Sequence, residues 1–95
     1  MYGLTVDFFD ITEVSLLEKS MNEIGAGRRT NGYASGQTLK GNFESENLGK
    51  MLLFVQADTS PTILIKRNND KDIYISFRDG AATRNLYNNL IEAMA

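Results

Sequence analysis

The sequence predicts a mainly β fold, a bent barrel of about seven antiparallel strands capped by a C-terminal helix. Two observations lead to this prediction. The second half of the chain holds three short apolar runs separated by turn residues, namely Met51–Val55, Thr62–Arg67 and Asp72–Phe77. An amphipathic segment then continues to the C-terminus. A chain of 95 residues is the size of one domain, so we expect residues 1–95 to form a single domain.

The N-terminal part is predicted to contain two strands. Tyr2–Phe9 alternates apolar and polar residues with the period of a strand. Ile11–Leu17 also has apolar residues at helical spacing, but its β-branched residues favour a strand that ends in a bend near Ser20. The alternative places Thr12–Glu23 in a helix and gives an α+β sheet with two helices.

The middle of the chain is polar and rich in glycine. Gly25–Gly27 is expected to be a flexible loop. Arg28–Ser35 and Gln37–Glu44 then have the character of two polar strands. Glycines at positions 32, 36 and 41 permit the sharp bends that barrel corners require.

Three apolar strands follow, over Leu52–Ala57, Thr62–Arg67 and Asp72–Phe77. They are joined by turns at Asp58–Pro61 and Asn68–Lys71, whose residues favour turn conformations. Side chains alternate between the two faces of a strand. In the last strand we therefore expect Ile73, Ile75 and Phe77 to point inward. Tyr74 and Ser76 are expected to point outward.

The C-terminal segment is predicted to be a helix. Asp79 is a good N-cap residue, and the helix runs to about Met94. Its apolar residues form one stripe, composed of Leu86, Tyr87, Leu90, Ile91 and Met94. Such a stripe must cover an apolar surface, and the open end or a face of the sheet is available.

The composition excludes several kinds of function. The chain has no histidine and no cysteine, which removes the commonest general base, cysteine-based zinc sites and disulfides. The net charge of −2 argues against a nucleic-acid partner, because duplex-binding proteins cluster Lys and Arg. The longest apolar run, Met51–Val55, is far shorter than the roughly 20 residues of a membrane span. We expect no enzymatic activity, no cofactor and no metal site.

The Gly25–Gly32 loop is the strongest candidate binding site. Its glycines can expose backbone N–H groups, and Arg28 and Arg29, together with Lys40, can bind a phosphate or a carboxylate. The segment matches neither the P-loop nor the dinucleotide-binding motif. The alternative is a mobile loop whose exposed arginines pair with the acidic N-terminal segment.

Two other groups of residues have structural explanations. The acids Asp7, Asp10 and Glu13 lack the order of a calcium-binding loop and are expected to be solvated charges at a strand edge. A second group could form an interaction face, although packing inside the barrel is the plainer explanation. Its members are Met51, Tyr74 and Tyr87.

The order of these motifs resembles the bacterial pleckstrin-homology-like (PH-like) domains. The resemblance covers roughly Arg28–Met94, about two thirds of the chain, and includes the Asp79 that opens the helix. The motifs that carry it are Arg28–Tyr33, Gly36, Gly41–Phe43, Gly49–Lys50, Leu53–Val55, Ile63–Ile65, Ile73–Ser76 and the helix residues Leu86 and Leu90.

The resemblance implies a non-enzymatic binding or interaction module, because such domains are not known as enzymes and are often appended to bacterial membrane proteins. We expect a protein partner or self-association, a cytoplasmic or membrane-peripheral location, and a membrane tether through a preceding N-terminal segment. The alternative is binding of an anionic small molecule or lipid head group through the Gly25–Gly32 loop. Lipid-binding PH domains use a basic loop between their first two strands, whereas Arg28 and Arg29 come later in this chain.

Overall fold

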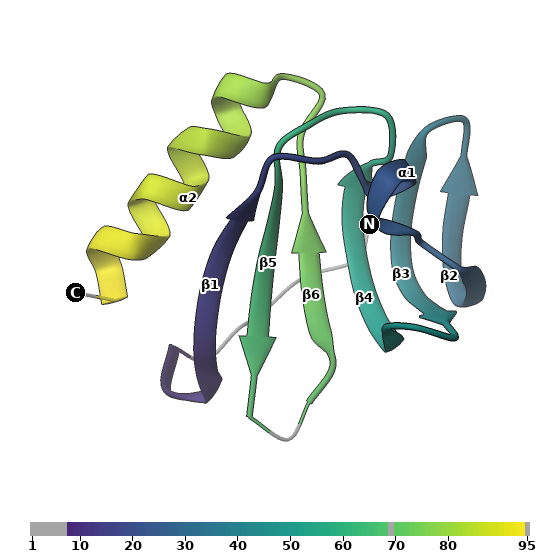
Figure 1. Ribbon diagram of the computed structural model, residues 1–95, viewed down its shortest axis with the longest axis horizontal. Helices are drawn as coiled ribbons and strands as arrows, with labels where there is room; N and C mark the ends of the chain where they lie inside the picture. Colours follow the sequence, from purple (N-terminus) through teal and green to yellow (C-terminus); the bar gives the residue numbers. More distant parts are fainter. Residues whose placement is uncertain (1–7, 69, 95) are drawn as a thin grey trace.

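The computed structural model describes residues 8–68 and 70–94, which form one six-stranded sheet and two α-helices (Figure 1). The elements in chain order are η1 (Phe8–Asp10), β1 (Ile11–Leu17), α1 (Met21–Ile24), β2 (Arg28–Ser35), β3 (Thr38–Ser45), β4 (Gly49–Gln56), β5 (Thr62–Arg67), β6 (Asp72–Ile75) and α2 (Gly80–Met94). The prediction of a mainly β fold with a C-terminal helix is confirmed.

The predicted bent barrel of antiparallel strands is wrong for the described residues, which form an open sheet with one parallel pair. The strand order is β1-β5-β6-β4-β3-β2, so β1 and β2 are the edges of the sheet formed by the described residues. The β5–β6 hairpin lies between β1 and β4, and β6 runs parallel to β4 from the Met51–Asp72 pair to the Phe54–Ile75 pair. Because β1 pairs with β5 rather than with β2, the sheet stays open.

The N-terminal strand of the described chain has the predicted bounds, Ile11–Leu17. The alternative helix over Thr12–Glu23 is wrong except for its last turn, which is α1. Ser20 and Glu23 form a capping box there, in which the Ser20 hydroxyl accepts from the Glu23 N–H at 3.3 Å and the Glu23 carboxylate accepts from the Ser20 N–H at 3.0 Å. The predicted strand Tyr2–Phe9 lies outside the described residues except for its last two, which belong to η1.

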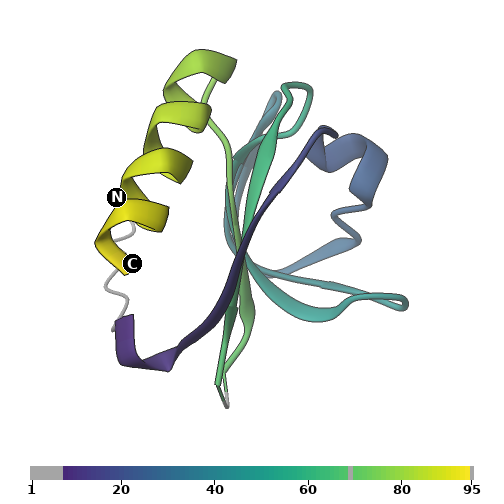
Figure 2. The same ribbon diagram turned by 60° about the vertical axis from the view of Figure 1, so that its left-hand side comes forward.

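The two helices lie on opposite sides of the sheet (Figure 2). We call these sides the α1 face and the α2 face. On the α1 face, Leu17, Ile24, Ala26 and Leu39 pack against a buried cluster. That cluster consists of Met21, Phe43, Met51, Leu53, Val55, Ala57, Leu64 and Tyr74. On the α2 face, the buried cluster consists of Ile63, Ile65, Ile73 and Ile75, all from β5 and β6.

The helix α2 packs mainly against β1 and β5, at one end of the sheet (Figure 1). Leu86, Tyr87 and Leu90 contact the isoleucine cluster, as the apolar stripe predicts. The other two stripe residues are exposed, Ile91 to 41% and Met94 to 38%, so the buried part of the stripe ends at Leu90. None of the helices in residues 8–68 and 70–94 is long and apolar enough to cross a membrane.

The expected inward and outward sides of the last strand are wrong in two respects. Tyr74 and Ser76 are buried, because the α1 face of the sheet is covered as well as the α2 face. Phe77 lies beyond the end of β6 and is 42% exposed. This exposed aromatic residue marks the site described below.

Candidate binding face

The described residues place no helix over the part of the α2 face formed by β4, β3 and β2 (Figures 1 and 2). Directly opposite residues of neighbouring strands share a face. The register therefore places Tyr33, Lys40, Phe54 and Ile75 in one row across this face. The row begins in the isoleucine cluster under α2 and ends at Tyr33, which is 48% exposed.

A cleft of about 310 Å³ lies beside this row, where the parallel strands β4 and β6 end. We call it the Phe77 cleft. Its lining residues are Lys40, Phe54, Val55, Gln56, Ser76, Phe77 and Arg78. This volume is at the lower end of the range for small-molecule pockets, so the cleft suits one or two side chains of a partner.

The polar residues of the cleft are tied to the sheet. The Ser76 hydroxyl accepts from the Gln56 N–H at 3.1 Å and donates to the Gln56 carbonyl at 3.3 Å. The Ser76 N–H donates to the Phe54 carbonyl at 3.0 Å, which continues the pairing of β6 with β4 for one residue beyond Ile75. The Gln56 side-chain amide donates to the Thr38 hydroxyl at 2.9 Å. These bonds fix the residues between the two strand ends.

Phe77 is held at both of its backbone polar groups. Its N–H donates to the Thr83 hydroxyl at 2.9 Å, and its carbonyl accepts from the Thr59 hydroxyl at 2.9 Å. Thr83 is fully buried on α2, so the first of these bonds ties the segment after β6 to the helix. The ring of Phe77 is thus exposed on a fixed backbone, which lowers the conformational entropy that a partner must remove on binding.

Among the residues that the structure describes, two cations and no acid line the Phe77 cleft. Neither Lys40 nor Arg78 forms an ion pair within the described residues. The carboxylate of Asp79, next to Arg78 in the chain, instead caps α2 by accepting a hydrogen bond from the Ala81 N–H at 2.9 Å. Each of three other clefts on the described residues contains at least one glutamate. The Phe77 cleft therefore combines an exposed aromatic ring with two positive charges, which suits an anionic group attached to an apolar one.

The structure does not bring the three predicted site residues together. Lys40 lines the Phe77 cleft, whereas Arg28 lies at the far end of the β2–β3 hairpin. Lys40 and Glu44, the residue opposite Arg28, are four positions apart on β3, or about 13 Å. Arg29 is opposite Phe43, on the other face of the sheet from Arg28 and Lys40.

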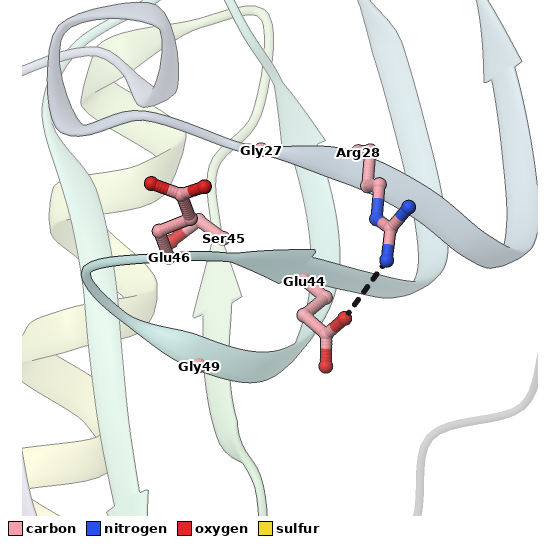
Figure 3. Close-up of a pocket in the computed structure, with 6 residues that line it drawn as sticks. All are labelled: Gly27, Arg28, Glu44, Ser45, Glu46 and Gly49. Atoms are coloured by element: carbon pink, nitrogen blue, oxygen red, sulfur yellow. Dashed lines mark hydrogen bonds and ion pairs between the residues drawn. The ribbon is translucent and has the colours of Figure 1, made fainter.

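Arg28 lines a separate cleft of about 820 Å³ (Figure 3). Its guanidinium forms an ion pair with Glu44 at 3.4 Å. Figure 3 shows Glu46 on the other side of this cleft, beside Ser45. Because the cleft has two carboxylates and one guanidinium, its own charge does not favour an anion.

Sequence reasoning found Lys40 but missed the other residues of the Phe77 cleft. Phe77 was expected to face inward, and Arg78 was not singled out. A signal was present, since an aromatic residue and a cation, Phe77 and Arg78, stand side by side between an apolar strand and the cap of the helix at Asp79. The suggested interaction face is not formed, because Met51 and Tyr74 are buried on the α1 face while Tyr87 packs on the α2 face. The packing explanation is confirmed.

The shifted pKa values belong to structural contacts outside the Phe77 cleft. The hydrogen bond from Arg84 lowers the pKa of Glu18, and those from Ser20 lower the pKa of Glu23. Burial raises the pKa of Tyr74. Within residues 8–68 and 70–94, no group of three or more acidic side chains is placed to hold a metal ion.

Comparisons with known proteins do not assign the chain to a family. No family model matches it, and neither the curated proteins nor the solved structures give a significant match.

Proposed function

We propose that this chain is a non-enzymatic binding module, of the PH-like type that its sequence resembles, and that it holds a partner protein at the Phe77 cleft. One observation carries the proposal: the exposed ring of Phe77 stands on a fixed backbone beside Lys40 and Arg78, two cations that form no ion pair among the described residues. Exposed aromatic residues and arginine are enriched at protein interfaces.

The chemistry of the cleft defines the partner. An aspartate or glutamate side chain can accept hydrogen bonds from Lys40 and from the guanidinium of Arg78, which suits a carboxylate in a bidentate arrangement. An apolar or aromatic side chain next to that acid can pack on the rings of Phe54 and Phe77. The partner is therefore a protein segment that presents an acidic residue beside an apolar one.

Selection from a displayed library of random peptides tests this proposal. The full chain is the target, and the Phe77→Ala variant removes peptides that bind elsewhere. We expect the enriched peptides to combine an acidic residue with an adjacent aromatic or aliphatic residue. Fluorescence anisotropy then measures the dissociation constant of one synthesised peptide. Arg78→Glu and Lys40→Glu should each weaken binding by at least about tenfold, or about 1.4 kcal/mol.

Lys66→Glu is the matched control for Lys40→Glu. Lys66 is an exposed strand lysine that lies on β5, one residue from Ile65 of the α2 face, and so points to the other face. The Lys66→Glu variant should bind the peptide with a dissociation constant within about twofold of wild type. Enriched peptides that contain no acidic residue would contradict the proposal. Equal weakening of peptide binding by Lys40→Glu and Lys66→Glu would contradict it as well.

A second candidate function is binding of an anionic head group through the Gly25–Gly32 loop. Arg29 favours it, because this side chain is exposed and forms no ion pair among the described residues. Arg28, by contrast, is already paired with Glu44. Binding through this loop would make the chain peripheral to a membrane.

Vesicle binding distinguishes this second candidate from the first. Sedimentation with phosphatidylcholine vesicles, with and without phosphatidylserine, is measured at low and at physiological salt. If the loop binds head groups, Arg29→Ala should lose more binding than Arg28→Ala, and Phe77→Ala should lose none. Absence of binding to anionic vesicles at low salt would dispose of this function.

A further inference from the structure

The edge strand β2 has a protected half and an unprotected half. Proteins discourage unwanted pairing at a sheet edge with charged residues, bulges and proline. The first half of β2 has two of these devices, the charges of Arg28 and Arg29 and a register irregularity between Arg29 and Asn31. The second half, Asn31–Ser35, has no charge, no proline and no irregularity, and it is largely exposed.

The other edge of the described sheet is better protected. The strand β1 carries the exposed Glu13 and has a register irregularity between Ile11 and Glu13. The helix α2 also packs against it. Of the two edges, only the second half of β2 offers a regular, uncharged row of backbone groups to another strand.

We propose that two copies of this chain pair antiparallel through Asn31–Ser35, with Tyr33 opposite Tyr33. A twofold axis perpendicular to the sheet relates the two strands, so opposite residues must share a face. The regular segment of five residues has Tyr33 at its centre. This register places Asn31 opposite Ser35 and Gly32 opposite Ala34, and it avoids the irregularity.

The side chains suit this self-pairing. The two Tyr33 rings meet on the α2 face, where each is 48% exposed in the single chain, and cross-strand aromatic pairs stabilise antiparallel sheets. Asn31 and Ser35 can form a hydrogen bond on the same face. On the α1 face the paired residues Gly32 and Ala34 are small, which lets the two edges approach without a clash.

The charges also permit it. Each Arg29 lies four residues before Tyr33 on its own strand, so the two Arg29 residues are about 26 Å apart along the joined ribbon. This distance exceeds the Debye length of about 8 Å at physiological salt. The arginines that would repel a copy in other registers therefore lie outside the paired segment.

Single cysteines test the register directly, because the natural chain has none. Residues opposite each other in an antiparallel pair have Cα atoms about 4.5–5.5 Å apart, within the range of a disulfide. Tyr33→Cys should form a disulfide-linked dimer under mild oxidation. Ser35→Cys alone should not, since its two copies lie four residues apart, or about 13 Å. An equimolar mixture of Asn31→Cys and Ser35→Cys should form the mixed dimer.

Analytical ultracentrifugation of the unmodified chain supplies the second measurement. We expect a concentration-dependent mass that approaches two chains. Tyr33→Lys places like charges opposite each other and removes the aromatic pair, so it should raise the dimer dissociation constant about tenfold. Asn88→Lys, the matched control, adds the same charge on α2, outside the paired segment, and should leave the dissociation constant within about twofold of wild type. Both positions are exposed, so neither variant threatens the fold.

Several outcomes would overturn this inference. A chain that stays monomeric up to about 1 mM does not self-associate usefully. A dimer in which Tyr33→Cys crosslinks no better than Ser35→Cys uses another interface. A dimer that is as stable in Tyr33→Lys as in wild type also uses another interface. Phe77→Ala should not alter dimerisation, so failure here is separate from failure of the proposed binding function.

Discussion

The buried hydroxyl of Thr83 accepts a hydrogen bond of 2.9 Å from the backbone N–H of Phe77. Thr83 lies in the first turns of α2, and Phe77 is the first aromatic residue after β6. The bond therefore joins the helix to the cleft at a point where no strand pairing remains. It makes the orientation of Phe77 depend on the docking of α2, which links the stability of the fold to the candidate site.

Replacing Thr83 by valine tests this link. Valine keeps the shape of threonine but cannot accept a hydrogen bond, so the partly buried N–H of Phe77 loses its partner. We expect Thr83→Val to lower the free energy of unfolding by about 1–3 kcal/mol. Urea denaturation measures this change, and amide hydrogen exchange at Phe77 should become faster.

Thr83→Ser is the control, because serine keeps the hydroxyl and loses a buried methyl group. It should cost about 1 kcal/mol through packing while it leaves the exchange rate of the Phe77 amide near that of wild type. If both variants accelerate exchange equally, the hydrogen bond does not hold Phe77.

The ion pair between Glu18 and Arg84 should make stability depend on pH in the acidic range. Two hydrogen bonds of 2.6 and 2.9 Å join the end of β1 to α2, and the Arg84 guanidinium lowers the pKa of Glu18 in the folded chain. The stabilisation is present above the ordinary glutamate pKa of about 4.3. It is lost as the pH falls through the lowered, folded value.

Urea denaturation of wild type and Glu18→Gln between neutral and acidic pH measures this contribution. Wild type should be the more stable of the two at neutral pH, and the difference should disappear at acidic pH. Glu46→Gln, at an exposed position without an ion pair in the described residues, should follow wild type at every pH. A difference between wild type and Glu18→Gln that does not change with pH would contradict the assignment.

Tyr74 should produce the opposite dependence at alkaline pH. Burial on the α1 face raises its pKa, with a further contribution from the charge of Asp72. Its contribution is fully present below the ordinary tyrosine pKa of about 10 and is lost as the pH rises towards the folded value. Tyr74→Phe should lose less stability than wild type above about pH 10. Tyr33→Phe, at an exposed position, should keep the wild-type profile in alkaline urea titrations.

Local features of the fold could be predicted from the sequence. The strands β1 and β5 have their predicted bounds, because each is a run rich in β-branched or apolar residues with turn or cap residues beside it. The helix α2 also begins and ends where Asp79 and its apolar stripe indicate. Each of these signals lies within the segment itself, so no knowledge of distant partners was needed.

Strand order and the candidate site could not be predicted, because both depend on pairing between distant segments. Alternation assigns residues of one strand to two faces, but it does not say that β6 lies parallel to β4. That pairing places Phe77 and Arg78 near Lys40 at the ends of the strands. Likewise, the partner of Arg28 is Glu44, which only the β2–β3 register brings opposite it.

The boundary of the packed stripe on α2 gives a last prediction. Leu90 is partly buried against the isoleucine cluster, whereas the adjacent Ile91 is 41% exposed. Leu90→Ala should lower the free energy of unfolding by about 1–2 kcal/mol, less than the roughly 2–5 kcal/mol of a fully buried leucine. Ile91→Ala should change it by no more than about 0.5 kcal/mol, as exposed substitutions usually do. Equal losses in urea denaturation would show that the helix packs with a different face than the one that contacts β1 and β5.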